Sequence, residues 1–126
     1  MKSHLLYISM LTSVISAASA EERYDHFPSL EAADMKTAFC NIQSYNQTLA
    51  SITAKETLSA DDMVKVHELT YTLENAIMRL QADLNQAAID LEEVHQASER
   101  LEQSTIQTYG KRYLDATRQL LSGPKC

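Results

Sequence analysis

The chain has 126 residues, 44% of them hydrophobic, with two glycines, two prolines and a formal net charge of −6. These values exclude a collagen-like or disordered chain and argue against a glycine-rich β-sandwich. The acidic balance argues against nucleic-acid and anionic-membrane partners, because both are bound through clustered lysine and arginine. A chain of this length forms at most one domain.

Residues 1–20 have the layout of a secretory signal peptide. An uncharged apolar run from Leu5 to Ala18 ends at the small-x-small site Ala18-Ser19-Ala20. Because the run is shorter than the ~20 residues that cross a bilayer, we predict cleavage between Ala20 and Glu21 rather than a membrane anchor. The first residues contain no twin arginine, which favours the general export route. We therefore expect a soluble periplasmic protein with no membrane attachment after cleavage.

A first helix is predicted after an irregular N-terminal arm over residues 21–28. Pro28 ends the arm, and Ser29 is a candidate N-cap. Apolar positions then alternate by three and four, which indicates a helix from about Leu30 to Lys55 with one face towards a partner. These positions are Met35, Ala38, Ile42, Tyr45, Leu49 and Ile52.

A long central helix follows. Ser59 and Asp62 have the spacing of a capping box, and neither glycine nor proline occurs between Ser59 and Ser104. An apolar row alternates by four and three along this whole stretch, which predicts one helix over about 60–103, roughly 66 Å long. The alternative is a turn near residues 83–86 and an up-down four-helix bundle. The row consists of Val66, Thr70, Leu73, Ile77, Leu80, Leu84, Ala87, Leu91, Val94, Ser98 and Leu101.

Ser104 and Gln107 form a second capping box, which predicts the start of a last helix. Its apolar face comprises Ile106, Tyr109, Tyr113, Ala116 and Leu120, and Gly123-Pro124 ends it before a tail over 123–126. The predicted fold is all-α, a long antiparallel helical hairpin plus a C-terminal helix within residues 29–122. Because short turns force antiparallel neighbours, the first and last helices would lie end to end along the central one.

A rod only two helices thick buries little surface, which favours a further contact. Val64, Tyr71 and Met78 recur every seven residues outside the apolar row, beside His67 and Glu74. We interpret these five residues as a partner-facing strip. The expected partner is a second copy, in a homodimer, or another envelope protein.

The chain has two cysteines, Cys40 and Cys126. Two cysteines in an exported protein usually pair, and the C-terminal tail is long enough to extend from the end of the last helix to Cys40. We therefore predict a Cys40–Cys126 disulfide. Two free thiols and an intermolecular bridge are the alternatives.

Metal-ligating patterns are weak in this sequence. His67 and His95 would lie roughly 42 Å apart on one helix, and the Glu-x-x-His pattern that a carboxylate-bridged di-metal site needs twice occurs once, at Glu92–His95. Met63 and His67 have i, i+4 spacing and offer an alternative metal- or haem-binding function, although packing of Met63 in the core is the preferred interpretation. No nucleophile with a nearby base is visible, so we expect a non-enzymatic protein without a cofactor.

The size, compartment and helical pattern resemble the small periplasmic haem-binding four-helix bundles. The resemblance implies haem ligation by a methionine early in the first helix, which Met35 matches, and by a histidine late in the last helix. Residues 104–122 contain no histidine, and the Cys-x-x-Cys-His motif of the c-type members does not occur. Haem is therefore disfavoured.

A closer resemblance covers most of the chain after residue 20. The segments His-Glu-Leu-Thr-Tyr-Thr-Leu-Glu-Asn-Ala over 67–76, Glu-Val-His-Gln-Ala-Ser-Glu over 93–99 and Glu-Arg-Tyr-Asp-His-Phe over 22–27 resemble a family of short exported bacterial proteins of unknown function. The resemblance implies a periplasmic helical protein of proteobacterial type, and it implies no reaction.

Overall fold

The computed structural model describes residues 28–123, 125 and 126. Within them the chain forms three helices and no strand: α1 (Met35–Thr53), α2 (Ala60–Glu99) and α3 (Gln103–Ser122). The prediction of an all-α fold with three helices is confirmed, and the alternative turn near residues 83–86 is wrong because α2 runs through it without a break. The predicted signal peptide, its cleavage site and residues 21–27 of the predicted arm lie outside the described residues.

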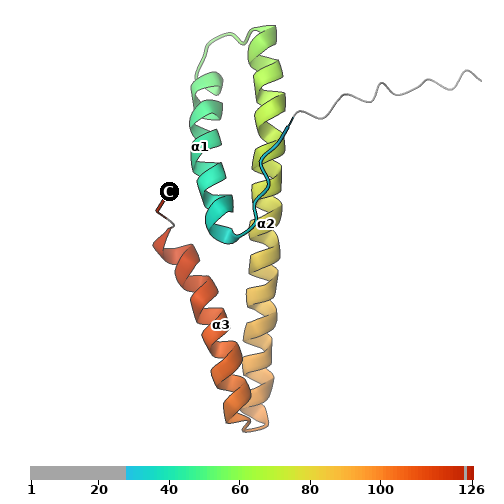
Figure 1. Ribbon diagram of the computed structural model, residues 1–126, viewed down its shortest axis with the longest axis vertical. Coiled ribbons are helices and arrows are strands. Elements are labelled where there is room, and N and C mark those ends of the chain that lie inside the picture. Colours follow the sequence, from blue (N-terminus) through green and yellow to red (C-terminus); the bar gives the residue numbers. More distant parts are fainter. Residues whose placement is uncertain (1–27, 124) are drawn as a thin grey trace, which may run out of the picture.

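The helices form a rod in which α2 is the long element. Figure 1 shows α1 antiparallel to one half of α2 and α3 antiparallel to the other half, so that α1 and α3 follow one another along α2. The C-terminal end of the chain lies beside α1. This is the end-to-end arrangement expected from the helix lengths. None of the described helices is both long enough and apolar enough to cross a membrane.

α1 begins five residues later than its apolar pattern suggests. Its N-cap is Asp34 rather than Ser29, and the Asp34 carboxylate accepts a 2.7 Å hydrogen bond from the Thr37 N–H. The preceding segment is held outside the helix by α2, because the Leu30 N–H donates to Thr72 Oγ1 at 3.0 Å. Asn75 Nδ2 also donates to Ser29 Oγ at 3.1 Å. One backbone donor and one side-chain hydroxyl of this segment are thus bound by side chains of α2.

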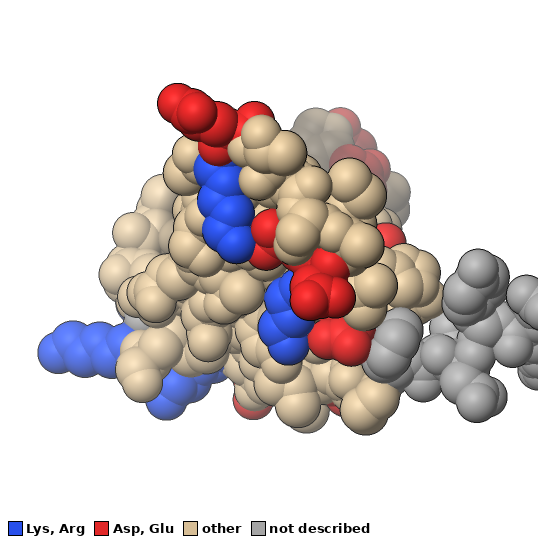
Figure 2. Space-filling view, turned by 90° about the horizontal axis from the view of Figure 1, so that it is seen from above, with Lys and Arg blue, Asp and Glu red and all other residues tan. Residues whose placement is uncertain are grey.

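α2 begins as the sequence predicts. Ser59 Oγ accepts from the Asp62 N–H at 3.1 Å, and Asp62 Oδ2 accepts from the Ser59 N–H at 3.0 Å, which completes the capping box. Lys55 Nζ lies 2.6 Å from Asp62 Oδ1 and ties the α1–α2 turn to the helix start. Figure 2 looks down on this end of the rod, where basic and acidic side chains lie side by side.

α2 ends at Glu99, four residues before the predicted boundary. Leu101 has a φ of 58°, and the Glu102 N–H donates to the Ala97 carbonyl at 2.9 Å, which is the hydrogen-bond pattern of a Schellman motif. The predicted capping box at Ser104 is also wrong. α3 starts two residues earlier, with Glu102 at the N-cap and no side-chain cap.

The side of α2 that packs is rotated from the predicted apolar row. The residues buried on it are Leu69, Thr72, Ala76, Ala87, Asp90 and Ala97, most of them one position before a member of that row. Short side chains let neighbouring helix axes approach closely, and this side carries three alanines and a threonine. The four large apolar members of the predicted row that therefore stay exposed are Ile77, Leu84, Leu91 and Leu101. The predicted apolar face of α1 is confirmed, with Met35, Ala38 and Ile52 buried.

Candidate interaction face

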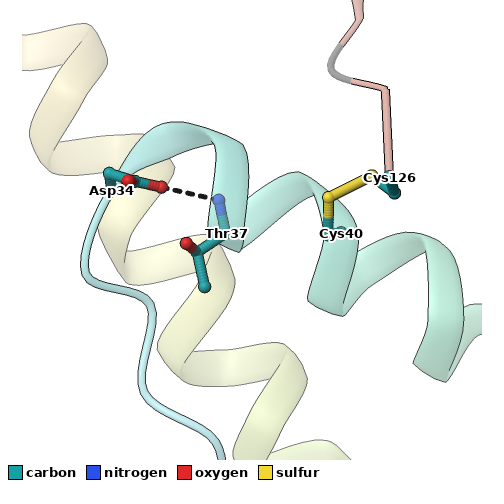
Figure 3. The surroundings of a disulfide bond; sticks show 4 residues. All are labelled: Asp34, Thr37, Cys40 and Cys126. Atoms are coloured by element: carbon teal, nitrogen blue, oxygen red, sulfur yellow. Dashed lines mark hydrogen bonds between the residues drawn. A yellow bond between two sulfur atoms is a disulfide. The ribbon is translucent and has the colours of Figure 1, made fainter.

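The two cysteines come together as predicted. Cys40 in α1 and Cys126 in the C-terminal tail have an S–S distance of 2.18 Å and a Cα–Cα distance of 5.4 Å. Figure 3 shows the tail descending onto α1 less than two turns after the Asp34 cap. The disulfide thereby joins the end of the chain to the start of α1, at the point where α1 and α3 adjoin.

The predicted partner-facing strip lies along the N-terminal half of α2. Val64, His67, Glu74 and Met78 are exposed, and Tyr71 is half-buried. His67 Nε2 and the Tyr71 hydroxyl are 3.1 Å apart, with their rings in an edge-on arrangement 5.1 Å between centroids. The strip is therefore available on the surface of one chain, and its contact with a partner stays a prediction.

Met63 and His67, which the alternative metal- or haem-binding function names, both lie near the start of α2, and that function stays a prediction. Met63 is 58% exposed, so its predicted packing in the core is wrong. The imidazole Nε2 of His67 already has the Tyr71 hydroxyl as a hydrogen-bond neighbour. In the described part of the chain, no group of three or more His, Cys, Asp or Glu side chains is placed to hold a metal ion.

Charged side chains in the middle of α2 all lie on its packed side. Between residues 77 and 91 they are Arg79, Asp83 and Asp90. These three line a cleft of about 370 Å³ where α1, α2 and α3 meet. Arg79 makes a two-pronged contact with Asp83, with Nε–Oδ2 and Nη2–Oδ1 distances of 3.0 and 2.9 Å.

Asp90 is the buried member of this group, with 3% of its surface exposed. Its Oδ1 accepts a hydrogen bond from Gln86 Nε2 at 3.0 Å and forms an ion pair with Arg112 Nη2 of α3 at 2.9 Å. A buried carboxylate requires such partners because its desolvation is costly. The charged side chains in the middle of α2 thus pair with groups on α2 itself and on α3, within the molecule.

The opposite side of mid-α2 is an uncharged and mostly apolar surface, which we call the open face. Five of its side chains are large, apolar and roughly half exposed: Ile77 46%, Met78 65%, Leu84 48%, Ile89 55% and Leu91 45%. Gln81, Ala82, Asn85 and Ala88 complete it, and all four are exposed. None of these nine residues is charged, and the face extends over about 22 Å of helix.

Of the predicted strip, the open face includes Met78 alone. Three other residues of the open face could have been found from the sequence, because Ile77, Leu84 and Leu91 recur every seven residues. Because they belong to the longest apolar row, that row by itself suggests packing against the other helices of the chain. The side of α2 that packs is centred about one residue before this row, so these three side chains lie outside the core and are exposed.

The remaining groove of note lies between α1 and α2, with a volume of about 530 Å³. Its lining mixes apolar and polar groups, including Tyr45 and Leu69, and the ion pair between Lys65 Nζ and Glu68 Oε2 at 3.3 Å crosses one side of it. A charged and hydroxyl-rich lining of this kind offers less apolar area to a partner than the open face does.

A protein-family model described as "Family of unknown function (DUF6746)" matches residues 1–122. No curated protein and no solved structure matches the chain. The family match agrees with the resemblance noted in the central helix. Within this chain, Leu69, Thr72 and Ala76 of that segment are buried, so part of the resembling segment builds the contact between α2 and its neighbours.

Proposed function

This chain belongs to the family of unknown function DUF6746, and from that premise we propose that it is a non-enzymatic binding protein of the bacterial envelope. It acts through helix-face contacts made by the open face of α2, together with the adjoining strip Val64, His67, Tyr71, Glu74 and Met78. Its partner is a protein surface that is itself largely apolar.

The observation that carries this proposal is the open face. Contiguous exposed apolar patches of several hundred Å² are uncommon on monomeric proteins and mark interaction sites. Here Ile77, Leu84 and Leu91 repeat with the heptad spacing that suits packing against another helix. The charges of the same stretch are turned inward, so a partner can cover the face without desolvating a charged group.

Export through the general route is the second part of the proposal. The apolar run before Ala18-Ser19-Ala20 supports it, and so does the Cys40–Cys126 pair, because disulfides persist in oxidising compartments. Mass spectrometry of the protein isolated from the periplasmic fraction, without reducing agent, tests this point. We expect a chain that begins at Glu21 and lacks two hydrogens; an uncleaved chain confined to the cytoplasm would overturn it.

In-cell photo-cross-linking tests the binding role of the open face. A photoreactive phenylalanine replaces Gln81 or Asn85 on the face, and Gln43 on α1 serves as a matched exposed control. We expect protein adducts from the first two positions and none from Gln43. Equal labelling at all three positions, or none at Gln81 and Asn85, would contradict the proposal.

A further inference from the structure

We propose that the occupant of the open face is a second copy of this chain, packed antiparallel about a two-fold axis between Leu84 and Asn85. This inference rests on the proposed function, because it names the partner of the same face. It is carried by three observations: the heptad spacing of the face, its charge pattern and its area.

The residue pattern of α2 is complementary to itself when one copy is reversed. With the axis between Leu84 and Asn85, Gln81 faces Ala88 of the second copy, and the short Ala88 side chain leaves room for the longer Gln81. On one flank of this row Ile77 lies beside Leu91 of the second copy, and Leu84 lies beside its own counterpart at the axis. On the other flank Met78 lies beside Glu92.

The charges at the two ends of the face select the antiparallel arrangement. Glu74 and His95 are both exposed and lie on the row that also contains Gln81 and Ala88, about 32 Å apart along the helix. In the antiparallel pair Glu74 of one copy lies opposite His95 of the other, twice, and the His95 imidazole also lies 3.4 Å from Glu99 of its own helix. A parallel pair would set Glu74 against Glu74, which is unfavourable because like charges then face each other.

The area of the face indicates a weak dimer rather than a permanent one. Its half-exposed large apolar side chains provide on the order of 500 Å² per copy, or about 1,000 Å² for the pair, which is the lower limit of specific interfaces. Interfaces of this size support reversible association, and we expect a dissociation constant of roughly micromolar order.

Sedimentation equilibrium of the mature protein between about 1 and 200 μM, at pH 7, tests the inference. We expect a reversible monomer–dimer equilibrium that Leu84→Glu weakens at least tenfold, because it buries two carboxylates at the axis. Leu121→Glu is the matched control, since Leu121 is an exposed leucine on α3 outside the face. Gln81→Arg provides a second variant that removes no apolar side chain, and circular dichroism verifies that each variant is folded.

A charge exchange tests the orientation. His95→Glu alone should weaken the dimer several-fold, because it sets a carboxylate against Glu74 of the other copy, and the double variant Glu74→Lys/His95→Glu should restore it. A protein that stays monomeric at 200 μM, an association insensitive to Leu84→Glu and Gln81→Arg, or a double variant no better than His95→Glu alone would overturn the inference. If Gln81 and Asn85 cross-link to a different protein and the chain is monomeric in solution, the inference of a second copy is wrong and the proposed function is supported.

Discussion

Leu101 occupies the left-handed backbone region at the end of α2, with a φ of 58°. A side chain with a Cβ is strained there, and glycine is the usual residue at this position of a Schellman motif. The Leu101 side chain gains no compensating burial, because 88% of its surface is exposed. The reversal from α2 to α3 therefore depends on the helices that flank it rather than on the residue at the turn.

Replacing Leu101 with glycine should stabilise the protein by about 1 kcal/mol, since it relieves the left-handed strain and loses little buried surface. Urea unfolding followed by circular dichroism measures the change. Leu121→Gly is the matched control: Leu121 is equally exposed but lies inside α3, where glycine should destabilise by up to about 1 kcal/mol. A destabilising Leu101→Gly would show that the turn does not carry the strain described.

Asp62 links the stability of the α1–α2 turn to pH. A hydrogen bond from Lys55, and then the N–H and hydroxyl of Ser59, lower the pKa of Asp62 from 3.8 to about 2. Because the pKa is lower in the folded state, this stabilisation is complete above about pH 4 and is lost as the pH falls towards 2. Stability against urea should therefore decrease over that window.

Side-chain NMR titration measures the pKa of Asp62 directly. Lys55→Met should move the pKa of Asp62 upward, towards 3.8, because it removes the largest of the interactions that lower it. Lys125→Met, which changes an exposed lysine of the tail, should leave it in place. An Asp62 midpoint near 4 in the unmodified protein would contradict the described contact.

At the scale of elements, α3 is held to α2 by a polar contact as well as by apolar ones. No residue of α3 is fully buried, and Tyr109, Tyr113 and Leu120 are half-buried on its inner side. The Arg112 guanidinium pairs with buried Asp90 and also lies 5.0 Å from the centroid of the Tyr109 ring. This contact fixes the position of α3 along α2.

Arg112→Met should destabilise the protein by roughly 1–3 kcal/mol, because it leaves the buried Asp90 carboxylate with Gln86 as its remaining described partner. Chemical unfolding measures the loss. Lys111→Met is the control on the same helix: Lys111 is exposed and bridges to Asp115 on the surface, so its removal should change stability by less than about 0.5 kcal/mol.

The sequence pattern predicted the number and extent of the helices better than it predicted which side of each helix is buried. The helix count, the continuity of α2 and the Ser59 cap all follow from local patterns, and the structure confirms each. The side of α2 that packs does not follow from the apolar row, because the neighbours approach where the side chains are small, at Ala76 and Ala97. The open face was missed for the same reason.

Two boundaries also depended on information that local patterns lack. α1 starts late because Thr72 and Asn75, more than forty residues away, bind the segment before it. α2 ends early at a leucine in a conformation that leucine seldom adopts. Tertiary hydrogen bonds set the first boundary. The second lies at a residue whose type disfavours the observed backbone conformation, so the packing of the flanking helices sets it.

At the scale of the whole molecule, the Cys40–Cys126 bond closes a loop with a sequence separation of 86. The double variant Cys40→Ser/Cys126→Ser should lower the free energy of unfolding by about 3–5 kcal/mol, according to the loop-entropy model. Urea unfolding measures the loss, and the reduced form of the unmodified protein should match the variant. A loss below about 1 kcal/mol would indicate that the unfolded chain is already restricted. Hydrogen exchange should report the loosening first in the last turn of α3.

The end-to-end placement of α1 and α3 on α2 has a consequence for the order in which this protein matures. Each of the two antiparallel pairs, α1 with α2 and α2 with α3, is built from segments adjacent in the sequence and can assemble without the other. When both pairs have formed, the end of α3 carries Cys126 to Cys40 on α1, so the folded arrangement itself holds the two sulfur atoms together. Once formed, the bond joins the α1–α2 pair to the α2–α3 pair, so that neither pair can separate far from the other while the disulfide is intact.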